Sequence, residues 1–507
     1  MKFNKKLLLS LSFVFIIYFS SYKLVTFTYD NIIVENSSIK YRIANILYPI
    51  IDNYHLYKLF YLNPKLFNNY KPNLTISLSK NDIKTNDSVI NSLVMSNQEI
   101  LLDQNKNWRN AKALFQNKEI KIKYKFHGSA LASYYKGLNS YSIKSQKSIY
   151  GAKEFKLVNA EEMNFFNIFL NKLSNDLGLI SEDTGEILSV NDSKTINAYF
   201  FYKTFNPKYI HDNYGLKNPE IFRGITKWES YSDWHSSELD GTYYNLDSEN
   251  VTTSYLEKWK NLNSSSIDKT YIDENYFGKF FSLIYLFGST HQIIGDNDKW
   301  VISEKKILPV YRNEGSIRKI TTNELRDNKI FEVSHYQSNT LDKYLNIISM
   351  NGVLNSRNIY LNQLLKNKKE ILKSFDSIYE YNKTKHKIYN NHLKIKSFYL
   401  HIRRTLISNF EVINKYLNSG YTVILYDNNK LSLKSSRNNQ LKILVDNQSF
   451  TFNPKKVFNK SSKIISTKLN ELEVDNINNI NNLLIIDQIT KDTLVYEKDY
   501  KIISTFN

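Results

Sequence analysis

The spacing of apolar residues changes along this chain, and that change limits its fold more than any other feature. Apolar and polar residues alternate over residues 74–78 and 120–126, as in half-buried strands. Helical spacing follows over residues 164–177 and dominates residues 354–417, and from residue 420 onward strand-like runs return between Asn and Asp turns. A chain of 507 residues is also too long for a single hydrophobic core. The sequence therefore predicts an α+β fold divided into several domains.

The first residues have the pattern of an export signal. Lysines at positions 2, 5 and 6 precede an almost wholly apolar run over residues 7–22, which resumes after Lys23. Residues 7–27 are long enough to cross a bilayer if the Lys23 ammonium extends to the interface. Because no small-x-small cleavage site is visible, we expect an uncleaved single-pass anchor over residues 1–29, with a cleaved signal peptide as the alternative. The bulk of the chain then lies outside the cytoplasm, in the periplasm or at the cell surface.

Composition narrows the classes of partner. The chain has no cysteine, which excludes disulfides, thiol nucleophiles and thiolate metal sites. Its net charge of +19 is spread along the whole sequence, which favours acidic surfaces such as anionic lipid or polysaccharide. No basic arm, zinc finger or aromatic RNA-binding signature is present, so we do not expect nucleic-acid binding. An envelope protein or a surface polysaccharide is the expected partner.

The remaining chain divides into four predicted segments. Residues 30–71 have mixed helical spacing and are expected to form a juxtamembrane helical segment. Residues 72–353 combine strands and helices in one body. Residues 354–418 form a basic helical extension, in which the lysines occupy solvated faces. Residues 419–507 are expected to form a small all-β C-terminal module.

One stretch of the body combines residues suited to phosphoryl transfer. His291 stands six residues before Asn297, Asp296 and Asp298 flank that asparagine, and a strand-like run leads on to Glu314. A nucleotide-dependent phosphotransferase needs a group to handle the acceptor hydroxyl proton, and amide and carboxylate oxygens to hold magnesium. An ordinary turn is the alternative interpretation, because Asp-Asn-Asp is also a common turn sequence.

Segments of the body follow one another in the order of a known family. They are KIKYKFHG at 121–128, NSYSIK at 139–144, FKL at 155–157, DLGL at 176–179, YKTFNPKYI at 202–210 and the stretch from His291 to Glu314. In this order the chain resembles the CotH kinase family, the spore-coat-type atypical protein kinases, as a divergent membrane-anchored envelope member. The resemblance covers roughly residues 72–410. It implies a reduced protein-kinase-like body that transfers phosphoryl from ATP, with Mg²⁺ or Mn²⁺, to Ser or Thr of an envelope partner.

The resemblance also assigns roles to residues of this sequence. Lys144 matches a strand lysine that holds nucleotide phosphates, although it could equally be an exposed strand lysine. Asn297 and Glu314 match the metal ligands. His291 matches a residue that accepts or relays the proton, with capping of the preceding helix as its alternative role. Asp296 flanks Asn297 and is a second catalytic candidate that could also share the metal.

Two departures from the family pattern leave the enzyme activity open. The family's metal-binding Asp falls on Asn313 or Glu314, and the acidic residue that should pair with the lysine falls on Thr204. Because threonine cannot form that ion pair, Lys144 would be less well oriented for catalysis. A catalytically inactive kinase-like scaffold that binds envelope proteins or polysaccharide is therefore the alternative function. A glycoside hydrolase is less favoured, since no aromatic-flanked sugar cleft is evident.

Overall fold

The computed structural model describes most of the chain from residue 72 onward, as a mixture of helices and strands that confirms the α+β class. The described residues are 72–95, 101, 105–128, 139–159, 164–192, 196–223, 269–293, 298–303, 306–312, 317–327, 339–389, 392–419, 421–427, 430–435, 437–446, 448–453, 456–459, 464–467, 470–474, 483–496 and 503–505. The predicted anchor (1–29) and juxtamembrane segment (30–71) lie outside these residues. Among the described helices, none is both long and apolar enough to cross a bilayer.

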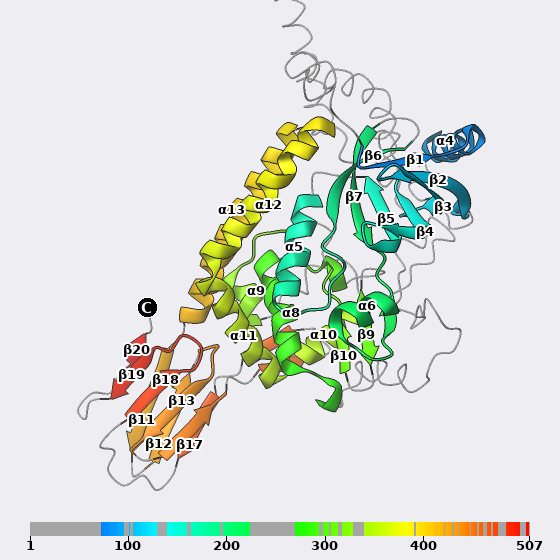
Figure 1. Ribbon diagram of the computed structural model, residues 1–507. Helices are drawn as coiled ribbons and strands as arrows, with labels where there is room; N and C mark the ends of the chain where they lie inside the picture. The colour runs from blue at the N-terminus through cyan, green and yellow to red at the C-terminus, as the bar shows by residue number, and fades with distance from the viewer. Residues whose placement is uncertain are drawn as a thin grey trace, which may run out of the picture.

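The first part of the described chain is a closed barrel with the strand order β1-β2-β3-β4-β5-β7-β6 (Figure 1). Its strands are β1 (Leu74–Ser77), β2 (Arg109–Phe115), β3 (Lys118–Phe126), β4 (Tyr141–Ile149), β5 (Ala152–Asn159), β6 (Glu186–Asn191) and β7 (Ile196–Lys203). Neighbouring strands are antiparallel, except that β1 pairs parallel to β6 and thereby closes the barrel. Helix α4 (Lys80–Met95) connects β1 to β2.

Alternation along each strand decides which side chains fill the barrel. In β3, Ile120, Ile122 and Tyr124 are buried, whereas Lys121 and Lys123 are exposed on the outer face. The strands predicted at 120–126 and 141–143 are thus confirmed. The closed barrel itself does not match the reduced kinase-like body that the sequence predicts. The difference arises from the pairing of β1 with the distant β6, which the alternation within either strand does not specify.

A mainly helical body accompanies the barrel, and its first helix, α5, lies in the chain between β5 and β6. Its elements are α5 (Asn164–Asp176), α6 (Pro207–Tyr214), β8 (Glu220–Arg223), η4 (Lys269–Tyr271), α8 (Glu274–Phe287), η5 (His291–Ile293), β9 (Lys299–Ser303), β10 (Lys306–Pro309), α9 (Thr322–Asp327), α10 (Asn339–Ile348) and α11 (Asn351–Lys366). The helix expected near residues 276–286 is α8, which is almost wholly buried. It packs closely against α11 at Gly278, where a Cβ atom would lie 2.2 Å from Ser356 Oγ. This pair forms the centre of the main hydrophobic core.

Two long helices flank the body, α12 (Lys368–Tyr389) and α13 (His392–Asn418), and they run side by side in Figure 1. Asp376 of α12 joins them, since it accepts hydrogen bonds from Arg403 Nε (3.0 Å) and Tyr399 Oη (2.7 Å) of α13. Helix α12 also packs against α5. The helical spacing predicted over residues 354–417 thus corresponds to most of α11 followed by this pair, and the predicted boundary at residue 354 falls within α11.

After α13, every described element is a strand. These are β11 (Tyr421–Asp427), β12 (Lys430–Ser435), β13 (Leu441–Val445), β14 (Gln448–Phe452), β15 (Lys456–Asn459), β16 (Ile464–Thr467), β17 (Asn470–Val474), β18 (Leu483–Asp487), β19 (Thr493–Tyr496) and β20 (Ile503–Thr505). They form sheets with the orders β17-β12-β11-β20 and β14-β13-β18-β19 and the hairpin β15-β16. Alternate residues of β12, β13 and β18 form the core between the two larger sheets.

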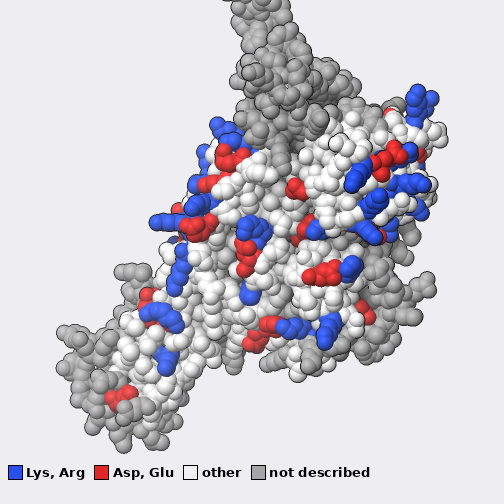
Figure 2. Space-filling view, in the orientation of Figure 1, with Lys and Arg blue, Asp and Glu red and all other residues white. Residues whose placement is uncertain are grey.

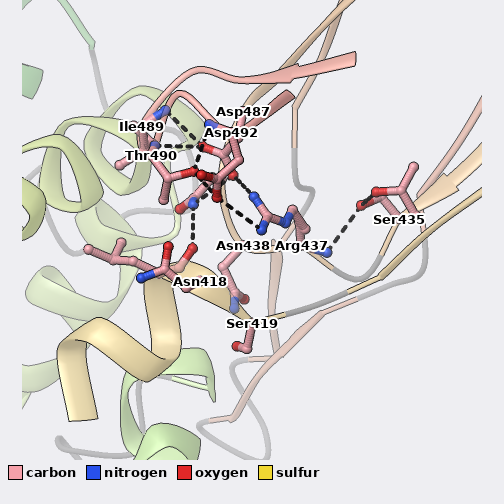
Figure 3. Close-up of polar contacts among 12 residues, drawn as sticks. Asn418, Ser419, Ser435, Arg437, Asn438, Asp487, Ile489, Thr490 and Asp492 are labelled. Carbon is pink, nitrogen blue, oxygen red and sulfur yellow. Dashed lines mark hydrogen bonds and ion pairs between the residues drawn. The ribbon is translucent and has the colours of Figure 1, made fainter. Parts of the chain in front are cut away.

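A buried polar network joins these strands to the helices (Figure 3). The Arg437 guanidinium pairs with the Asp487 carboxylate, and both side chains are 0% exposed. Asn439 Nδ2 donates to Asp487 Oδ2 (3.0 Å) and to the carbonyl oxygen of Leu417 at the end of α13 (2.9 Å). From α11, Asn358 Nδ2 donates to Asn439 Oδ1 (3.2 Å). The network therefore ties the C-terminal strands to both α11 and α13.

Candidate functional site

A buried group of charged side chains lies where the barrel meets the helical body. Glu182, in the connection after α5, accepts from Lys299 Nζ at 2.6 Å and pairs with Arg312 Nε at 3.3 Å. The side chains of Glu182, Lys299 and Arg312 are only 10%, 8% and 16% exposed. With Lys156 and His127 from the barrel, we call these residues the Glu182 cluster.

The backbone holds the three segments of this cluster together. Val310 N donates to the Lys299 carbonyl oxygen (2.8 Å), so the start of β9 lies beside the end of β10. Tyr311 N donates to the Ile180 carbonyl oxygen (2.7 Å), which places Arg312 beside the connection that carries Glu182. Because these contacts fix the backbone on both sides, the ion pairs depend little on flexible loops.

The barrel supplies the other side of the cluster. His127 lies between Ser142 Oγ, 3.2 Å from its Nδ1, and Tyr202 Oη, 3.2 Å from its Nε2. Lys156 of β5 pairs in register with Tyr202 of β7, and its ammonium lies 5.2 Å from the centre of the Tyr202 ring. The outer faces of β4, β5 and β7 thus meet the body at this point.

Burial and the neighbouring charges shift the pKa values of Glu182 and His127. Burial alone would raise the pKa of Glu182, but Arg312, Lys299 and Lys156 hold that pKa well below its usual range. Burial, with Lys156 and Arg312 nearby, lowers the pKa of His127 well below its usual value, so the ring is neutral at pH 7. Glu182 is therefore ionised and lies among three cations. Partly desolvated ammonium and guanidinium groups gathered in this way are able to bind an anionic group such as phosphate.

Lys144, the predicted phosphate-binding lysine, lies outside this cluster. Its side chain is 51% exposed on β4 and pairs with Glu154 Oε1 at 3.2 Å. Its ammonium also lies 5.4 Å from the centre of the Trp108 ring. These are the contacts of an exposed strand lysine, the alternative that the sequence left open. Lys156, two residues beyond Glu154 on β5, is instead a barrel lysine that belongs to the cluster.

The other predicted site residues fall largely outside the described part of the chain. His291 begins η5, but its side chain is not described, and Asp296, Asn297 and Glu314 lie in gaps. Their described neighbour Asp298 is buried, and Tyr344 Oη donates to its Oδ1 (2.7 Å). Burial raises the pKa of Asp298 to about 6. Within the described residues, no group of three or more His, Asp or Glu side chains is arranged to hold a metal ion.

Thr204 marks the position where the family pattern expects an acid. Its amide donates to the Glu154 carbonyl oxygen (3.1 Å), directly after β7. The buried carboxylate near the cations is instead Glu182, which sequence reasoning missed, together with Lys299 and Arg312. The available signal was weak: Lys299 directly precedes the apolar run WVI (300–302), and Glu182 stands two residues after the apolar pair at 179–180.

The chain matches no protein-family model and has no significant match among curated proteins. The CotH resemblance therefore stays a prediction from the order of the motifs.

Proposed function

We propose that this chain binds a nucleoside triphosphate at the Glu182 cluster and transfers its terminal phosphoryl group to Ser or Thr of an envelope protein. The observation that carries the proposal is the gathering of three cations around Glu182. Lys299 and Arg312 pair with Glu182 and are only 8% and 16% exposed, and Lys156 is close enough to lower the pKa of Glu182. Guanidinium and ammonium groups are the usual protein ligands of phosphate, and they bind it more strongly where they are partly desolvated.

Chain connectivity relates the predicted metal ligands to this cluster. Lys299 follows Asn297 by two residues, and Arg312 precedes Glu314 by two residues. The described ends of β9 and β10 lie side by side, so both segments leave the same end of one hairpin. Under the proposal, Asn297 and Glu314 hold Mg²⁺ or Mn²⁺, which would neutralise phosphate charge.

The remaining roles follow from the chemistry of each group. His291, with Asp296 as the second candidate, handles the proton of the acceptor hydroxyl. Lys156 is better placed than Lys144 to contact phosphate, because Lys156 approaches the cluster whereas Lys144 pairs with Glu154. The nucleotide supplies only the phosphoryl group, so positioning and charge are what the chain itself contributes.

A catalytically inactive scaffold is the second candidate, and Thr204 favours it. Threonine replaces the acid that should orient the phosphate-binding lysine, and small misplacements are costly in phosphoryl transfer. Such a scaffold would bind nucleotide, envelope proteins or polysaccharide without transferring phosphate. Nucleotide binding and phosphoryl transfer must therefore be measured separately.

The test is a thermal-shift titration of the full chain, in an uncharged detergent, with ATP and either Mg²⁺ or Mn²⁺. A ligand that binds only the native state raises the unfolding midpoint as its concentration exceeds Kd. We expect a metal-dependent shift that Arg312→Gln and Asn297→Ala abolish. Arg326→Gln is the matched control, because that arginine is 51% exposed and pairs with its neighbour Asp327.

Two outcomes separate the candidates. No shift at millimolar ATP with either metal would sink the nucleotide site altogether. A shift without transfer of labelled phosphate to envelope proteins would favour the scaffold.

A further inference from the structure

Lysine side chains gather on the outer face of the barrel over β2, β3 and β4 (Figure 2). We call this surface the lysine face; it consists of Lys112 of β2, Lys121, Lys123 and Lys125 of β3, and Lys144 of β4. Alternation along the strands produces it, since every second residue of β3 from 121 to 125 is a lysine that points away from the barrel interior. Two glutamates lie among these lysines, Glu119 and Glu154.

Strand register places like charges opposite one another on this face. Lys123 pairs in register with Lys144, and Lys112 with Lys121. Like charges in directly opposed positions destabilise a sheet. Glu119 offsets part of this repulsion through Lys112 (2.8 Å), and Glu154 does so through Lys144 (3.2 Å). Binding of an anionic ligand would reduce the repulsion that remains between the lysines.

Trp108 orders two of the ammonium groups. The Nζ atoms of Lys125 and Lys144 lie 5.0 Å and 5.4 Å from the centre of its ring, which is close enough for cation–π attraction. The Trp108 side chain is itself 39% exposed. This contact holds the lysines in place while their N–H donors can still reach a ligand, which reduces the entropy lost on binding.

The lysine face continues into the Glu182 cluster. Lys125 pairs in register with Ser142 of β4, Ser142 with Lys156 of β5, and Lys156 with Tyr202 of β7. Adjacent strands are about 4.8 Å apart, so Lys125 lies roughly 10 Å from Lys156 across the sheet. An extended polypeptide bound to the lysine face therefore needs only a few more residues to reach the Glu182 cluster.

We infer that the lysine face binds an extended acidic polypeptide, which it presents to the Glu182 cluster as the phosphoryl acceptor. Alternate lysines of β3 repeat about every 6.8 Å, which is also the spacing of alternate side chains in an extended peptide. A peptide with an acid at every second residue thus matches the lysines in register and carries its Ser or Thr between them. The acceptor role rests on the proposed function, whereas the binding itself does not.

The experiment measures binding of a labelled peptide of alternating Glu and Ser to the full chain by fluorescence anisotropy, without nucleotide. We expect Lys121→Gln/Lys123→Gln to raise Kd about tenfold, which corresponds to ~1.4 kcal/mol. The matched control is Lys366→Gln/Lys369→Gln, which removes the same charge from exposed positions on α11 and α12 and should leave Kd nearly unchanged. Added salt should weaken the wild-type complex, because exposed charges are screened.

Two results would overturn the inference. Equal losses in both double variants would mean that net charge, and not this face, attracts the peptide. The second result is competition by an acidic polysaccharide such as polygalacturonate. If it displaces the labelled peptide at a lower carboxylate concentration than the unlabelled peptide does, the face binds sugar acids in preference to peptides. Because no ATP is present, neither result depends on whether the nucleotide site works.

Discussion

Two buried charged groups in this molecule are built in opposite ways. In the network below α13, Arg437 lies between the carboxylates of Asp487 and Asp492 (Figure 3). Asp487 also accepts hydrogen bonds from the amides of Ile489 (2.8 Å) and Thr490 (2.9 Å). The Glu182 cluster, by contrast, gathers three cations, Lys156, Lys299 and Arg312, around one glutamate. The first group serves the fold, whereas under the proposed function the second also contacts the phosphates of a ligand.

The largest effect is expected where the charges are balanced. Asp487→Ala leaves the Arg437 guanidinium buried without its main partner, which should reduce the free energy of unfolding by about 3–5 kcal/mol. Urea denaturation monitored by circular dichroism measures this change. The matched variant Asp492→Ala should cost less than about 1 kcal/mol, because that carboxylate is 45% exposed. Similar losses in the two variants would contradict a dominant Arg437–Asp487 pair.

An added anion should compensate for the loss of the Glu182 carboxylate. Glu182→Gln removes the counter-charge of Lys299 and Arg312 and should reduce the free energy of unfolding by about 1–3 kcal/mol. Inorganic phosphate should restore stability in Glu182→Gln but not in Asp487→Ala, which thermal unfolding with increasing phosphate can measure. If phosphate rescues neither variant, or both equally, the distinction between the two groups fails.

His127 makes the Glu182 cluster sensitive to pH. Its pKa is lowered in the folded protein, so the unfolded chain binds more protons once the pH falls below about 6.5. The stability of the native state should therefore decrease as the pH falls from 6.5, and His127→Gln should remove that part of the decrease. Unfolding midpoints between pH 7 and pH 5 measure the difference between variant and wild type. Parallel curves for the two proteins would argue against a neutral His127 in the cluster.

The smallest expected effects are those of substitutions at two strand lysines, Lys144 and Lys156. Lys144→Gln breaks an exposed pair with Glu154 and should change stability by less than about 1 kcal/mol, with the affinity for nucleotide unchanged. Lys156→Gln should weaken nucleotide binding by about tenfold, or ~1.4 kcal/mol. Isothermal titration calorimetry with ATP and Mg²⁺ compares them. The reverse order of affinities would return the phosphate-binding role to Lys144.

The parts of the fold that the sequence predicted are those set by local pattern. Alternation gives β3, the apolar spacing gives α5 and α8, and Gly178, expected to end α5, has the positive φ (73°) that favours glycine. Helix α4 has no counterpart in the prediction, because Asn, Asp and Lys interrupt its apolar spacing. Closure of the barrel depends on the pairing of β1 with β6, more than a hundred residues apart, which neither strand encodes alone.

The site was harder to predict for the same reason. Alternation correctly indicates that Lys144 points out of the barrel, but not which outward lysine meets the helical body. Glu182, Lys299 and Arg312 come from three separate segments and become a cluster only through backbone contacts such as Tyr311 N to Ile180 O. Motif order alone led to His291, Asp296, Asn297 and Glu314, whose roles remain predictions.

The closed barrel also limits how a partner chain can be recognised. Among the described residues, every strand of it pairs with a neighbour on both sides, so none is an open edge strand. An open edge strand is what β-augmentation uses, the mode by which many domains capture peptides with little regard to sequence. Selectivity at the described barrel should then come mainly from side chains. Exchange of surface lysines for glutamates would thus redirect the protein to basic partners without disturbing a single backbone hydrogen bond of the sheet.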